Sequence, residues 1–145
     1  MDVLKRLPLA LLFLRVGVFI VMLMWTLDKL IKPEHAANVF KKFYLISGLD
    51  QGMLLAIGMA ELVIILGFVA GFMKRWTYGI VLLLHAISTL SSFGNYMNPW
   101  TNLLFFAAWP MLAACFALYY LRDADTLLVL DRKLEPPSQA TIATS

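Results

Sequence analysis

Three ionisable side chains lie inside long apolar runs of this sequence: Arg15, Glu61 and His85. An ionisable group inside the hydrocarbon layer of a membrane is costly, so it needs a partner and is a candidate for function. At a rise of 1.5 Å per residue, we expect all three in one half of a membrane-spanning bundle. A Glu–Arg–His cluster there would satisfy its own charges, and it could move a proton or hold a ligand carbonyl.

Each of these residues also has a plainer interpretation. Arg15 could extend its guanidinium to the cytoplasmic headgroups. Glu61 needs a buried partner or a proton, whether its role is structural or mechanistic. His85 could be a hydrogen-bonded interior histidine, and a bis-histidine haem within this chain is excluded because the second histidine, His35, lies in a connection. No metal site is predicted, since Cys115 is the only cysteine and lies in an apolar run.

Two helical stripes of polar residues accompany these three. At 100° per residue, Thr89, Ser92 and Tyr96 share the face of His85, and Thr26 and Lys29 share the face of Arg15. Such stripes avoid lipid, so we predict an outward-facing polar pocket with Glu61 and His85 at its floor. The residues expected to line it are Trp25, Thr26, Lys29, Ser88, Ser92, Asn95, Tyr96, Trp100 and Asn102. The alternatives are an interfacial anchor role for Trp25 and Lys29, and hydroxyls that bond the preceding turn.

The composition decides the class of protein. Hydrophobic residues make up 61% of the 145 residues and charged residues 14%, against about 45–50% and about 25% in soluble domains. We therefore expect an integral membrane protein whose main partner is the lipid bilayer. Binding to nucleic acid is not needed to explain the net charge of +3, because basic residues at span ends orient membrane proteins.

The predicted fold is all-α: a four-helix transmembrane bundle with spans at about 9–31, 49–72, 76–97 and 101–121. A short amphipathic helix over 33–46 is expected to lie at the membrane surface between the first two spans. Pro110 should kink the fourth span, and Gly67-x-x-x-Gly71 is a pattern typical of close helix packing. Residues 1–132 form one domain, and 133–145 are expected to be a disordered cytoplasmic tail.

The distribution of lysine and arginine predicts the orientation. One side of the predicted bundle collects seven basic residues and the other collects four, so the positive-inside rule puts both termini in the cytoplasm. The first group is Lys5, Arg6, Lys74, Arg75, Arg122, Arg132 and Lys133, and the second is Lys29, Lys32, Lys41 and Lys42.

Several of these residues together resemble the DoxX-like family of small four-span membrane proteins. The resemblance rests on Arg15 and Lys29 in LRVGVFIVMLMWTLDK, on Ala60-Glu61 followed by Gly67 and Gly71 before a basic turn, and on the closing Leu130-Asp131-Arg132. It covers about residues 10–132, and it departs from the family at Thr26, where members usually carry glycine. The resemblance implies a bacterial inner-membrane protein, in some members a subunit of a quinone-linked oxidoreductase.

Three functions are consistent with these patterns. The first is a membrane subunit of a redox enzyme complex that binds a quinone or a small polar substrate in the pocket. Such a subunit would need a protein partner or a bound cofactor, since no redox centre is predicted in the chain itself. The second is a non-catalytic accessory or assembly protein, and the third is a small solute carrier that acts as a homo-oligomer. Whether the chain is part of an enzyme stays open at this point.

Overall fold

The computed structural model describes residues 2–131, and the regular secondary structure of this part of the chain is all helical, without strands. The helices in chain order are α1 (Val3–Ile31), α2 (Pro33–Phe43), α3 (Gln51–Val69), α4 (Lys74–Ser91), α5 (Phe93–Tyr96), η1 (Pro99–Thr101), η2 (Leu103–Ala107) and α6 (Ala108–Tyr120). The tail predicted for 133–145 lies outside the described residues.

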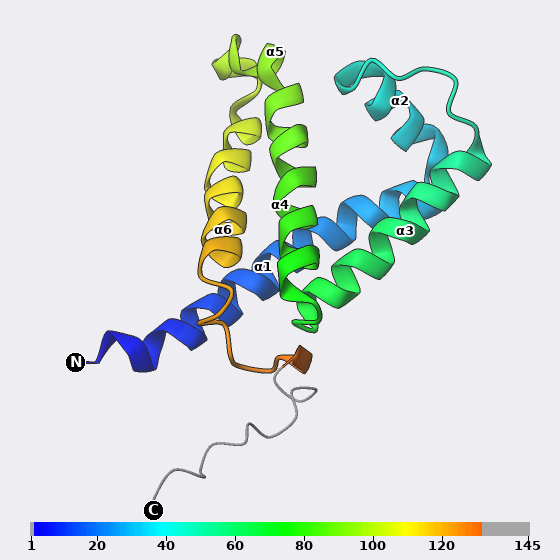
Figure 1. The fold of residues 1–145 in the computed structure, drawn as a ribbon. Helices are drawn as coiled ribbons and strands as arrows, with labels where there is room; N and C mark the ends of the chain where they lie inside the picture. Colours follow the sequence, from blue (N-terminus) through cyan, green and yellow to red (C-terminus); the bar gives the residue numbers. More distant parts are fainter. Residues whose placement is uncertain (1, 132–145) are drawn as a thin grey trace, which may run out of the picture.

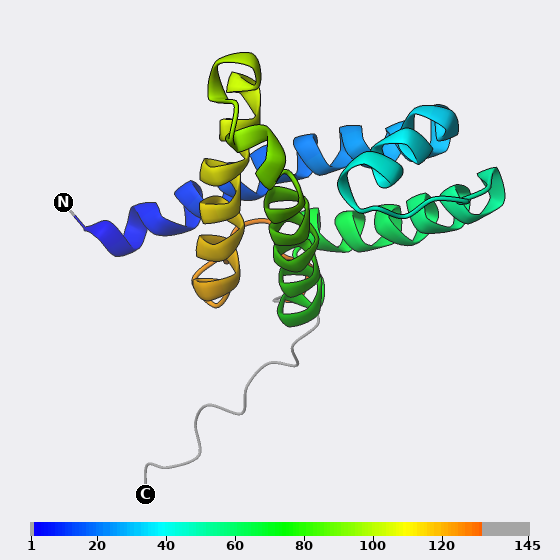
Figure 2. The ribbon, with the colours of Figure 1, turned by 90° about the horizontal axis from the view of Figure 1, so that it is seen from above.

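The long helices form two pairs. Helix α1 packs along α3, and α4 packs along α6 (Figure 1). The pairs cross each other where α3 turns into α4, and they diverge toward the end that carries α2 and α5 (Figure 2). The hydrophobic core lies at the crossing and includes Val18, Ile65, Phe68, Val81 and Leu118.

Three helical segments are long and apolar enough to cross a membrane by length and composition: Val3–Ile31, Gln51–Val69 and Leu103–Tyr120. This indicates a membrane protein in a lipid environment. Helix α4 is not among the three, because Lys74, Arg75 and its polar stripe make it less apolar.

The third and fourth predicted spans differ from the observed helices. Helix α4 ends at Ser91 instead of continuing to 97, only the single-turn α5 follows before the 3₁₀ turns, and the next long α-helix begins at Ala108. Pro110 therefore lies in the first turn of α6, where its missing N–H costs no helical hydrogen bond, and it does not kink the middle of a helix. The preceding turn is the 3₁₀-helix η2, which suits the restriction that a proline places on the residues before it.

Gly71 closes α3 rather than packing it against another helix. Its φ is +62°, the left-handed region that glycine adopts freely. The Gly71 N–H donates to the Phe68 carbonyl at 3.1 Å and the Phe72 N–H to the Gly67 carbonyl at 2.9 Å, which is the Schellman pattern. A Cβ at this position would lie 3.0 Å from both methyl carbons of Val129, so the glycine also lets the C-terminal segment approach.

That C-terminal segment folds back under the turn between α3 and α4. The N–H of Leu130 donates to the Ala70 carbonyl at 2.9 Å. The carboxylate of Asp131 accepts from the N–H groups of Met73 at 2.7 Å and Lys74 at 3.0 Å, and so caps the start of α4. The segment after α6 is therefore part of the folded domain.

Candidate functional site

Arg15 does not pair with Glu61 or His85, which corrects the predicted cluster. Its guanidinium is fully buried and Nη1 donates to Asp125 Oδ2 at 2.9 Å and to the Tyr78 hydroxyl at 3.1 Å. Nη2 donates to the carbonyls of Leu127 at 2.7 Å and Leu128 at 3.1 Å. The side chain therefore turns into the protein and does not reach for headgroups.

This ion pair joins the two helix pairs at their crossing. Tyr78 in α4 donates its hydroxyl proton to the same Asp125 oxygen at 2.7 Å, and Asp125 is fully buried. Lys74 adds bonds from Nζ to the carbonyls of Arg122 and Asp125, at 2.8 Å and 3.1 Å. Arg15, Tyr78 and Asp125 thus form a buried hydrogen-bond network that joins α1, α4 and the C-terminal segment.

Glu61 is paired with Lys29. The Lys29 ammonium lies 2.9 Å from Glu61 Oε2, with only 14% and 12% of the two side chains exposed, and it also donates to the Trp25 carbonyl at 3.1 Å. Helices α1 and α3 approach closely here because Gly58 has no side chain: a Cβ would come within 2.7 Å of Leu30. The two charges neutralise each other on the side of α1 and α3 that faces α4 and α6.

His85 links α4 to the start of α6. Its Nε2 lies 3.0 Å from the Ala108 carbonyl, and the residue is 9% exposed. A carbonyl only accepts, so we assign the ring proton to Nε2 and leave Nδ1 as an acceptor in the neutral imidazole.

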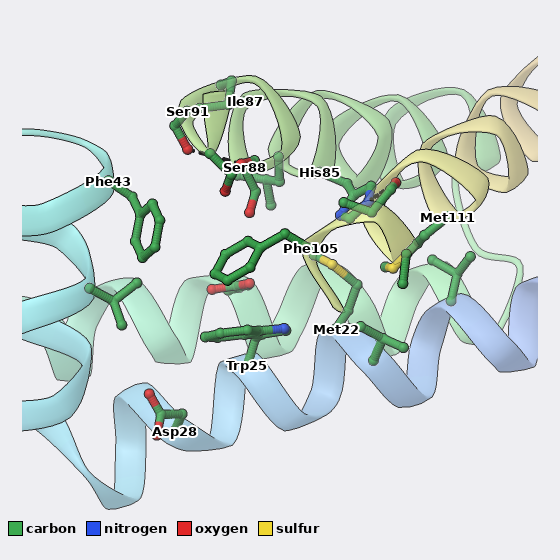
Figure 3. Close-up of a pocket in the computed structure, with 18 of the residues that line it drawn as sticks. Met22, Trp25, Asp28, Phe43, His85, Ile87, Ser88, Ser91, Phe105 and Met111 are labelled. Atoms are coloured by element: carbon green, nitrogen blue, oxygen red, sulfur yellow. Dashed lines mark hydrogen bonds between the residues drawn. The ribbon is translucent and has the colours of Figure 1, made fainter. Parts of the chain in front are cut away.

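A cavity of about 910 Å³ lies between the two helix pairs (Figure 3). Helix α1 forms its floor, α2 closes one end, and α4, η2 and α6 form the opposite wall. The residues of α1 that line it share one helical face: Phe13, Leu14, Gly17, Val18, Val21, Met22, Trp25, Asp28 and Lys29. Most of the remaining lining is apolar, including Val39, Phe40 and Phe43 from α2.

The structure brings some of the predicted pocket residues to this cavity and keeps others away. Six residues line it: Trp25, Lys29, Glu61, His85, Ser88 and Ser92. Six others named above do not: Arg15, Thr26, Asn95, Tyr96, Trp100 and Asn102.

The residues that stay away from the cavity have partners or exposure of their own. Thr26 is fully buried, with its hydroxyl bonded to the Met22 carbonyl at 2.8 Å. The end of α4 at Ser91 takes Asn95 and Tyr96 off the helical face of His85, and the Tyr96 hydroxyl donates to the Thr89 carbonyl at 3.0 Å. The Asn102 amide donates to Asn98 and Thr101, and Trp100 is 89% exposed.

Sequence reasoning missed the contributions of α2, of Phe105 in η2 and of Ser91. The amphipathic pattern of 33–46 gave the helix but not which surface its apolar face covers. Phe43 from α2 and Phe105 from η2 approach each other across the cavity, with ring centroids 5.9 Å apart (Figure 3).

The described residues contain no group of three or more His, Cys, Asp or Glu side chains that could hold a metal ion. The site is therefore an apolar cavity with an ion pair, a histidine and a short row of serines in its wall. Such an arrangement suits a ligand with an apolar body and a small polar head group. No protein-family model, curated protein or solved structure matches this chain.

Proposed function

We propose that this protein binds a lipid-soluble, amphipathic molecule in the cavity between its two helix pairs. The observation that carries the proposal is the cavity itself, about 910 Å³ and lined mainly by apolar side chains. Ligand sites commonly have about 300–1,000 Å³ and a few well-placed polar groups in an apolar wall. The ion pair of Lys29 and Glu61 and the ring of His85 are those groups here.

The shape of the cavity favours a long ligand that enters from the membrane. The wall from Phe13 to Lys29 is roughly 24 Å long at 1.5 Å per residue. Phe13 and Trp25 line the cavity yet are 72% and 51% exposed, so the space is open along the side of α1. In a bilayer this side faces acyl chains, and an apolar ligand reaches it without crossing water.

The membrane arrangement that goes with this function has four spans. We propose that α4 crosses the bilayer beside α6, with its basic first turn in the cytoplasmic headgroup region. Both termini then lie in the cytoplasm of a bacterial inner membrane, and the cavity opens toward the outer half. Helix α2 lies at the outer surface, with Lys41 and Lys42 exposed to water.

We further propose that the ligand serves a redox enzyme complex of which this chain is a membrane subunit. The support for this step is the resemblance to the DoxX-like family, and a quinone is the ligand class it suggests. Electrons would be exchanged through a protein partner, because the chain offers only one cysteine and no metal-ligand group among residues 2–131.

An accessory or assembly role is the second candidate, and one feature favours it. The connection from α5 to η2 carries large apolar side chains that are well exposed: Phe93, Met97, Trp100, Leu103 and Leu104. A partner protein could cover them. In that case the polar groups of the cavity serve packing, and no small molecule accompanies the protein.

Analysis of the lipid extract of the purified protein separates these two functions. Gly17 lines the cavity and a Cβ there meets nothing within 4 Å, so Gly17→Phe puts a ring into the space. Gly94 is equally open but does not line the cavity, so Gly94→Phe is the matched control. We expect stoichiometric ligand by mass spectrometry with the wild type and Gly94→Phe, and its loss in Gly17→Phe. An extract that holds only bulk phospholipid in all three proteins would contradict ligand binding.

A further inference from the structure

The polar groups of the cavity wall divide unequally into donors and acceptors. The hydroxyls of Ser91 and Ser92 both donate to the Ser88 carbonyl, at 2.9 Å and 3.0 Å. The Nε2–H of His85 donates to the Ala108 carbonyl at 3.0 Å. Each donor is thus occupied within the protein, and these bonds leave acceptor sites facing the cavity.

His85 Nδ1 is an acceptor that the protein leaves free. Figure 3 shows one ring nitrogen bonded to the Ala108 carbonyl and the other on the cavity side of the ring. Within residues 2–131 this second nitrogen has no hydrogen-bond partner. A ligand with a donor group in the cavity can therefore form a hydrogen bond with this nitrogen.

The charge of the wall favours a neutral donor over a cation. The Lys29 ammonium lies 2.9 Å from the Glu61 carboxylate, so the pair carries no net charge. A second ammonium proton of Lys29 is donated to the Trp25 carbonyl. Asp28, at the end of the cavity near α2, has one carboxylate oxygen 2.7 Å from His35 Nδ1, so this oxygen already has a partner. Four donors remain among the described side chains that line the cavity: the hydroxyls of Ser88 and Tyr44, which also accept, the third proton of Lys29, and the indole N–H of the half-exposed Trp25 at the open side.

We infer that the head group of the cavity ligand is a neutral hydroxyl, alcohol or phenol, that donates a hydrogen bond to Nδ1 of His85. This inference rests on the proposed function and specifies its ligand class. A carbonyl or ether in the same place would only accept, and it would leave Nδ1 unpartnered. If the ligand is a quinone couple, the cavity therefore prefers the reduced, phenolic form.

A matched pair of probes tests the inference: 4-dodecylphenol and its methyl ether, 4-dodecylanisole. The two share ring and chain, and they differ only in that a methyl group replaces the hydroxyl proton in the ether. We expect the phenol to bind the detergent-solubilised full chain about tenfold more tightly by native mass spectrometry, which is the effect of one additional hydrogen bond.

Variants of His85 assign the preference to this residue. His85→Leu removes the acceptor and should bring the two affinities together, whereas His85→Gln keeps both a donor and an acceptor and should retain most of the preference. Equal, saturable binding of both probes to the wild type would overturn the hydroxyl inference while the proposed function stands. A phenol preference that persists in His85→Leu would also overturn it. Failure of both probes to bind saturably would count against the proposed function itself.

Discussion

The buried pair of Arg15 and Asp125 should be the most sensitive point of the fold. Both side chains are almost fully buried, at 1% and 0% exposure, and Nη1 and Oδ2 lie 2.9 Å apart. Replacing one partner leaves the other charge buried without compensation, which typically costs about 3–5 kcal/mol. Against a total stability of about 5–15 kcal/mol, that is a large fraction. We expect Arg15→Met to lower the free energy of unfolding by about this amount.

The double variant makes the prediction specific to the pair. Arg15→Met with Asp125→Asn removes both charges, so the combined loss should fall short of the sum of the single losses by about 1–3 kcal/mol. The free energy of unfolding is measured by titrating dodecyl sulfate into dodecyl maltoside micelles and following helicity by circular dichroism.

Glu61 provides the matched control for this cycle. It pairs with Lys29, so the effects of Arg15→Met and Glu61→Gln should add within about 0.5 kcal/mol. The reasoning would be refuted by additive losses for Arg15 and Asp125, or by strong coupling of Arg15 with Glu61 instead.

Three further predictions concern the rest of the molecule. Gly71→Ala should destabilise the fold by roughly 1–2 kcal/mol in the same titration, because the residue has a φ of +62°; unchanged stability would contradict the Schellman closure of α3. Lys29→Met should destabilise more than the double variant Lys29→Met/Glu61→Gln, since the single change leaves a carboxylate without its partner, and equal losses would argue against the pair. The orientation can be tested with single cysteines introduced into a variant that lacks Cys115. A membrane-impermeant maleimide should label a cysteine at Asn98 in intact spheroplasts and one at Arg75 only after permeabilisation. The reverse pattern would overturn the proposed orientation.

The sequence predicted the helical, membrane-type architecture because apolar runs and their length carry that information directly. It also placed Arg15 and Thr26 on one face of α1, and both are buried there, although Thr26 was expected to line the pocket and does not. It placed the amphipathic helix between the first two long helices, where Pro33 begins α2. These features depend on local periodicity, which one sequence is enough to show.

The partners of the ionisable residues were beyond such reasoning. Asp125 lies in a polar segment with no periodic pattern, 110 residues away from Arg15, and only the fold-back of that segment brings them together. Similar depth in the membrane suggested Glu61 as the partner, but depth says nothing about which helix faces which. Gly71 looked like a packing glycine because its requirement for a left-handed φ is invisible without the backbone.

Binding of a ligand beside Trp25 tests the central claim most directly. In a single-tryptophan protein that retains only Trp25, a bromine-bearing alkyl phenol should quench the fluorescence by direct contact, since Trp25 lines the cavity (Figure 3). We predict saturable quenching that is lost in Gly17→Phe and retained in Gly94→Phe. Quenching that rises without saturation, equally in all three proteins, would mean that the probe only dissolves in the surrounding detergent, and it would contradict a ligand site between the helix pairs.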